Sequence, residues 1–269
     1  CFIQVFTLLN IKPWKNAEEK NSLIDWDVTS YYAYLPAYFV HNDLSLKFIE
    51  EDTINYQGKH QFWPETAPNG GKVIKTTMGM SLLYFPFFMS SHLYASFSDS
   101  YTANGFSKPY EIGLAFSCVC YLFIGFLFIR RALLKCFSEN ITSFAFLSLL
   151  LGTNLFYYAT TEPCMSHAYT FSLTGVLLYY TPTWLNKFSL KSAIFFGLFS
   201  GLLVLMRPTN LIILCMILMY GIQTRENIKN RLLWLLRNKK LLLISFLLGF
   251  MVLFPQLLYW KTRIGENYI

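Results

Sequence analysis

Long apolar runs separated by short polar connections occupy the chain from about residue 112 onward. Six runs can be traced, at 112–134, 141–160, 166–184, 192–206, 209–222 and 241–260. A helix needs about 20 apolar residues to cross a hydrocarbon core ~30 Å thick. The pattern therefore predicts an all-α fold of about six transmembrane helices. We expect the two short runs to form a hairpin, because one long helix would bury Arg207 in mid-membrane at a cost of at least ~2.5–3.5 kcal/mol.

Composition agrees with a polytopic membrane protein. Apolar residues make up 54% of the chain, charged residues only 14%, and the mean hydropathy is +0.38. The net charge of +7 is no sign of nucleic-acid binding here, because excess Lys and Arg in such proteins marks the cytoplasmic connections. The six cysteines have no spacing that predicts a disulfide framework or a metal site.

The distribution of cations predicts the orientation. Three connections are basic, namely those near Arg130–Lys135, Lys187–Lys191 and 225–240, and the connections between them are nearly free of Lys and Arg. The positive-inside rule places the basic connections in the cytoplasm. Residues 161–165, Arg207 and the C-terminal tail then face outward.

The first part of the chain differs from the rest. The run at 1–9 is too short to span a bilayer, so we interpret it as the end of a first transmembrane helix in the N-terminal module of a longer protein. Residues 10–111 then form a long extracytoplasmic loop, with interfacial helices expected near 30–39 and 78–97. A true membrane span at 78–97 is the alternative, and we favour the interfacial interpretation.

Ionisable residues gather in the outward-facing segments. They include Asp25, Asp27, Lys75, Glu162, His167 and Arg207. A carboxylate can deprotonate an acceptor hydroxyl, and Lys or Arg can bind and stabilise a phosphate that leaves. This set therefore predicts transfer to or from a phosphate-linked lipid. The sequence offers no metal-binding cluster and no nucleotide-binding loop, so no cofactor is expected.

Four short segments resemble the polyprenyl-phosphate-dependent glycosyltransferases of the GT-C fold, which include protein O-mannosyltransferases and the lipid A aminoarabinose transferase. Asp27 and Tyr31, within WDVTSYYAYLPA, match the spacing of an Asp and an aromatic residue that follow the first transmembrane helix in that family. KTTMGM at 75–80 with FPFF at 85–88 resembles a Lys-containing stretch that leads into an interfacial helix. The other two segments are TTEPCMSHAYTF at 160–171 and GLLVLMRPTN at 201–210.

The resemblance implies a function and a set of roles. The chain would transfer a sugar from a polyprenyl-phosphate lipid to an acceptor, on the outer face of a bacterial inner membrane. Asp27 would be the catalytic base, and Lys75, Arg207, Glu162, His167 and Tyr31 would bind the donor. Independently of the resemblance, we expect Asp25 to be a solvated neighbour of Asp27 or to support Asp27 without contacting the substrate.

Other interpretations stay open. Asp27 is also a plausible helix N-cap, Arg207 a snorkelling cation, and Lys75 a contact to anionic lipid headgroups. Glu162 and His167 are equally compatible with ordinary loop and helix-start roles. A transporter or lipid-linked-sugar flippase is the first alternative function, and a polysaccharide polymerase or ligase of another helical fold is the second.

Overall fold

The computed structural model describes residues 2–16, 22–51, 62 and 64–264, and helices make up 73% of the chain. The predicted all-α class is therefore confirmed. The elements before residue 79 are α1 (Phe2–Ile11), η1 (Pro13–Asn16), α2 (Trp26–Tyr32), α3 (Tyr34–Phe39), α4 (Phe48–Glu51), and a two-stranded antiparallel sheet of β1 (Glu65–Thr66) and β2 (Lys72–Val73). The elements that follow are α5 (Gly79–Ser96), α6 (Lys108–Leu133), α7 (Glu139–Leu151), α8 (Leu155–Thr160), α9 (Ser166–Asn186), α10 (Leu190–Met206), η3 (Pro208–Asn210), α11 (Leu211–Leu218), α12 (Arg225–Arg237) and α13 (Lys239–Ile264).

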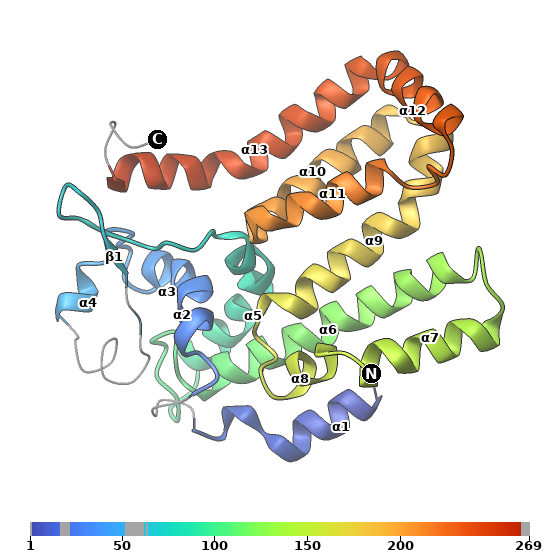
Figure 1. Ribbon diagram of the computed structural model, residues 1–269. Helices are drawn as coiled ribbons and strands as arrows, with labels where there is room; N and C mark the ends of the chain where they lie inside the picture. The colour runs from blue at the N-terminus through green and yellow to red at the C-terminus, as the bar shows by residue number, and fades with distance from the viewer. Residues whose placement is uncertain (1, 17–21, 52–61, 63, 265–269) are drawn as a thin grey trace.

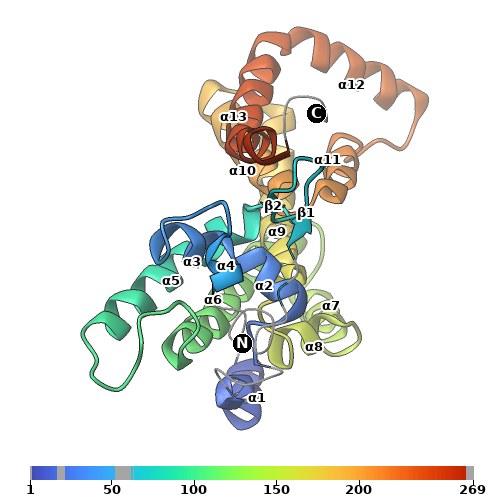
Figure 2. The ribbon, with the colours of Figure 1, turned by 90° about the vertical axis from the view of Figure 1, so that its left-hand side faces the viewer.

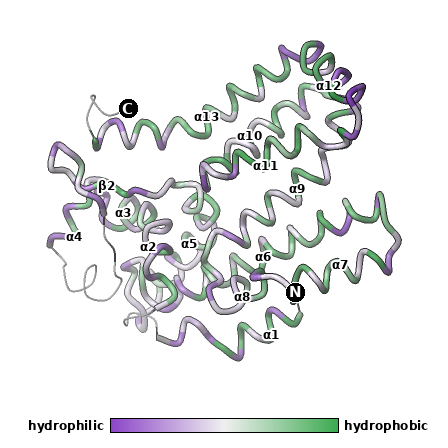
Figure 3. Tube along the Cα trace, viewed as in Figure 1, coloured by the Kyte–Doolittle hydropathy of each residue, from purple (hydrophilic) through white to green (hydrophobic). Residues whose placement is uncertain are grey.

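The helices give the molecule two distinct ends (Figure 1). The α6–α7 and α9–α10 connections, together with α12, lie at the right-hand end of the view. Helices α2, α3 and α5 and the C-terminal end of α13 lie toward the left. The basic connections of the sequence thus share one end of the structure, and the hydropathy colouring in Figure 3 shows the hydrophilic stretch of α12 there.

Close backbone contact between helices depends on small residues. A methyl group added to Gly197 of α10 would lie 2.4 Å from the carbonyl oxygen of Ser245, and one on Gly201 would lie 2.7 Å from that of Gly249. Gly125 of α6 and Gly175 of α9 make a similar approach, because a methyl group on Gly175 would lie 3.0 Å from the carbonyl oxygen of Gly125. Such small-residue interfaces let helix backbones pack closely.

Helix α5 joins the ends of two of the long helices. A methyl group on Gly79 would lie 2.4 Å from the backbone nitrogen of Met206, at the end of α10. Toward its other end, Ser91 donates a hydrogen bond to the carbonyl oxygen of Pro109, at the start of α6 (2.9 Å). Helix α5 therefore occupies the segment near 78–97 for which the sequence predicts a helix. Its interfacial placement stays a prediction.

In the described part of the chain, two helices, α6 and α13, are long and apolar enough to cross a membrane. Among the described residues, α7, α10 and the segment 208–218 are shorter apolar helices. The α10–α11 hairpin is present, and Asn210 stabilises its turn by donating to the carbonyl oxygen of Leu203 (2.9 Å). These helices give weak support to a membrane location.

Two segments differ from the sequence-based expectation. The run at 141–160 is not one helix, because α7 ends before Gly152 and α8 begins only at Leu155. Gly, Thr and Asn at 152–154 are residues that favour turns and helix ends. The basic connection at 225–240 contains α12, which begins with a capping box between Thr224 and Asn227. The many charged residues of this segment keep it from reading as an apolar run, although its apolar residues recur with helical periodicity.

Candidate functional site

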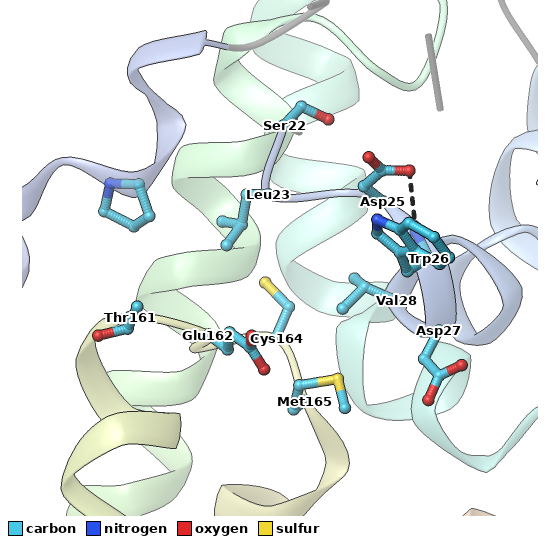
Figure 4. Close-up of a pocket in the computed structure, with 11 residues that line it drawn as sticks. Ser22, Leu23, Asp25, Trp26, Asp27, Val28, Thr161, Glu162, Cys164 and Met165 are labelled. Atoms are coloured by element: carbon cyan, nitrogen blue, oxygen red, sulfur yellow. Dashed lines mark hydrogen bonds between the residues drawn. The ribbon is translucent and has the colours of Figure 1, made fainter. Parts of the chain in front are cut away.

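A cavity of about 490 Å³ lies between the start of α2 and the turn that joins α8 to α9. This volume is within the ~300–1,000 Å³ range of small-molecule sites. Figure 4 shows its lining: Pro13, Ser22, Leu23, Asp25, Trp26, Asp27, Val28, Thr161, Glu162, Cys164 and Met165. Three of the predicted site residues, Asp25, Asp27 and Glu162, are thus brought together from two segments far apart in the sequence.

The two aspartates on the α2 wall have different environments. Asp25 is only 5% exposed and is the N-cap of α2, and its Oδ1 accepts the backbone N–H of Trp26 (2.9 Å). Asp27 is exposed in the first helical turn, and its carboxylate has no hydrogen bond or ion pair with any residue in the described part of the chain. The capping role considered for Asp27 therefore belongs to Asp25, which is not solvated. Asp27 is available to an incoming molecule.

Trp26 separates the two carboxylates (Figure 4) and adopts a strained backbone conformation. Its φ angle is +52°, in the left-handed region, which costs a bulky L-residue of order 1–3 kcal/mol. Trp26 is nevertheless 58% exposed and lines the cavity. Strain of this kind clusters at functional sites, so it supports the assignment of this cavity.

The facing wall contributes Glu162. Its Oε1 accepts a hydrogen bond from the Tyr157 hydroxyl (2.8 Å), and its side chain is half-buried. The carbonyl oxygen of Glu162 accepts the N–H of Met165 (3.1 Å), which closes the turn. A second acid is thereby fixed across the cavity from the α2 wall.

Helix α5 supports both walls. Ser81 donates to the carbonyl oxygen of Tyr31 in α2, and Tyr84, one turn later, donates to the carbonyl oxygen of Cys164 in the opposite turn. Residues three apart on a helix share a face. One face of α5 therefore sets the position of α2 relative to the 161–165 turn.

Glu111 is a buried acid behind the cavity that the sequence interpretation missed. It is completely buried in the first turn of α6, and its Oε1 accepts the backbone N–H of the lining residue Leu23 (3.1 Å). Its charge also acts on Cys164 in the facing wall. The sequence signal for this residue is an acid directly before an apolar run. The sequence interpretation used position 111 only as the end of the long loop.

His167 and Arg207 do not line the cavity. The His167 ring stacks on Tyr158 with centroids 4.0 Å apart. Arg207 is half-buried at the junction of α10 and η3, and it has no ion pair with a residue in the described ranges. A cation without a carboxylate partner suits an anionic ligand.

Lys75 and Tyr31 also lie outside the cavity lining. Lys75 is 74% exposed and its Nζ is 2.6 Å from Glu65 Oε1, and this hydrogen bond and charge raise the pKa of the Lys75 ammonium. The Tyr31 side chain is buried in the core. The segment after Lys75 is nevertheless tied to the site region, because Thr76 donates to Ser30 and Thr77 to Met206.

The charged residues of the described cavity lining are the acids Asp25, Asp27 and Glu162. No group of three or more His, Cys, Asp and Glu residues that could hold a metal ion occurs within residues 2–16, 22–51, 62 and 64–264. No protein-family model, curated protein or solved structure matches this chain.

Proposed function

We propose that the protein is an integral-membrane glycosyltransferase that uses a polyprenyl-phosphate-linked sugar at the end of the helices where the cavity lies. The observation that carries the proposal is the exposed Asp27 carboxylate, unpaired within the described chain, at the mouth of a cavity that also holds Glu162. The resemblance of the Asp27–Tyr31 spacing within WDVTSYYAYLPA to that of GT-C enzymes supports it by analogy.

The reaction follows from these groups. Asp27 accepts the proton of an acceptor hydroxyl, and the hydroxyl oxygen attacks the anomeric carbon of the donor sugar. The bond between that carbon and the phosphate oxygen breaks, and the polyprenyl phosphate leaves with the electron pair. Arg207 and Lys75 offset the charge that develops on the leaving phosphate. In this proposal the reaction takes place at the outer face of a bacterial inner membrane.

The shape of the cavity favours transfer over transport. Its described lining comes only from segments around 13, 22–28 and 161–165, at one end of the helices. A transporter needs polar groups along a path near mid-membrane. The helix centres carry few ionisable residues, which supports chemistry at the membrane boundary.

The test is an Asp27→Asn variant of the full chain, assayed in membranes with polyprenyl-phosphate sugars. Loss of a general base lowers kcat by about 10²–10⁴-fold. Asp99→Asn removes another exposed carboxylate outside the cavity and is the matched control, with activity expected to be unchanged. Normal transfer by a correctly folded Asp27→Asn protein rejects the catalytic role.

A further inference from the structure

Helix α12 has an exposed apolar face at the end of the molecule opposite the cavity. Ile228, Leu232 and Leu236, spaced four residues apart, are 48%, 56% and 67% exposed. That spacing places the three side chains in one row on one face of the helix. No residue of α12 is buried, so the helix does not contribute to the hydrophobic core.

The opposite face of α12 attaches the helix to the protein. The Trp234 ring packs against Phe188, with centroids 5.3 Å apart, and Arg231 donates to the carbonyl oxygen of Tyr220 (2.8 Å). Figure 2 shows α12 running crosswise beside the ends of α13 and α11. These contacts orient α12 so that the face with the row of Ile228, Leu232 and Leu236 points away from the rest of the chain.

Cations surround the apolar row. The segment 225–240 contains six Lys and Arg residues and a single acid, Glu226. On a helical projection Lys229 and Arg237 lie on one side of the row, while Arg231 is held by its hydrogen bond to Tyr220. The exposed Lys239 and Lys240 follow directly. An apolar stripe flanked by snorkelling cations matches the interface of an anionic bilayer.

We propose that α12 lies in the surface of an anionic phospholipid bilayer, with its Ile228–Leu232–Leu236 row in the acyl boundary and its cations on the headgroups. The α6–α7 and α9–α10 connections with Arg130, Lys135 and Lys191 lie at the same end of the helices, so they meet the same lipid surface. This surface is independent of the transferase activity, because it lies at the opposite end from Asp27.

The experiment places a nitroxide label at position 232 or, as a matched control, at the exposed Asn230 on another face of α12. The full chain, with Cys1, Cys120, Cys136 and Cys215 replaced by serine so that the label attaches to the introduced cysteine, is reconstituted into phosphatidylcholine vesicles with or without phosphatidylglycerol. With phosphatidylglycerol we expect the label at 232 to have a severalfold higher ratio of oxygen to nickel-chelate accessibility than the label at 230. In the neutral vesicles the difference shrinks.

A second variant tests the charges. Lys229→Gln with Arg237→Gln in the 232-labelled chain is expected to reduce the accessibility ratio in phosphatidylglycerol vesicles toward that of the neutral ones. Equal ratios at 232 and 230 overturn the proposal, and so does a ratio at 232 that is independent of phosphatidylglycerol. A label at 232 shielded from both reagents, as in a contact with a second copy of the chain, overturns it as well.

Discussion

At the scale of single residues, the cavity shows how neighbouring acids acquire different roles. Asp25 and Asp27 are separated by one residue, yet one is buried and accepts a backbone N–H while the other is exposed. Trp26, between them, has a left-handed φ of +52°. The spacing to Tyr31 distinguishes Asp27 in the sequence, whereas the burial of Asp25 depends on tertiary packing that the residue types do not predict.

Glu111 is expected to fix the α2 wall through Leu23. Glu111→Ala leaves the buried N–H of Leu23 without this acceptor, which costs about 1–3 kcal/mol in the free energy of unfolding. Glu111→Gln keeps a side-chain oxygen at the same place and is expected to retain most of the stability. Thermal unfolding of both variants in one detergent measures the difference, and equal destabilisation by Ala and Gln contradicts the hydrogen-bond role.

Substitution of Lys75 distinguishes two roles for this residue, a partner in a surface ion pair and a ligand of the donor phosphate. Because Lys75 and Glu65 are both well exposed, removing either charge is expected to leave the melting temperature unchanged. Under the proposed function, Lys75→Gln raises the KM for the lipid-linked donor. Glu65→Gln frees the ammonium and is expected to lower that KM or leave it unchanged. If the Lys75→Gln variant has the same KM for the donor as the unsubstituted protein, Lys75 forms only the surface ion pair and does not bind the donor.

At the scale of elements, the α10–α13 interface depends on the absence of side chains. Gly201→Leu is expected to force the helices apart, since even a methyl group at this position would lie 2.7 Å from the Gly249 carbonyl oxygen. Overpacking of this kind typically costs about 1–3 kcal/mol. Leu198→Phe enlarges an exposed position of the same helix and is the control. Unfolding midpoints in detergent measure both, and equal midpoints for the two variants contradict the close-packing account.

The same elements show how far the sequence predicts this fold. Apolar periodicity found the long helices α6, α9 and α13, because length and hydrophobicity are local properties. It missed the break at Gly152 and the helix α12, where turn residues and a capping box outweigh the average composition. The cavity brings together positions 27 and 162, and α5 holds the two segments in place. Contacts between residues so far apart in the sequence depend on tertiary packing that a single sequence does not reveal.

At the scale of the whole molecule, the last helix holds the first loop in place. Gln256 of α13 accepts the N–H of Met78 (2.7 Å) and donates to the Tyr34 hydroxyl (3.1 Å). Tyr34 in turn donates to the carbonyl oxygen of Thr76 (2.7 Å), and Tyr259 accepts the N–H of Ile74 (3.0 Å). The segment that carries Lys75 is thus bonded on both sides to groups distant in sequence.

This clamp predicts a long-range effect of a substitution in α13. Gln256→Leu removes an acceptor and a donor from a buried network, which costs about 1–3 kcal/mol locally. Amide hydrogen exchange at Ile74–Met78 is therefore expected to accelerate by roughly 5–150-fold, since each 1.4 kcal/mol is about tenfold. Gln4→Leu is the matched control, because Gln4 is also buried but bonds Ala159 instead. Its effect is expected at α1 and α8 with exchange at 74–78 unchanged. If both variants accelerate exchange at 74–78 equally, the coupling is a general loss of stability and not a clamp made by α13.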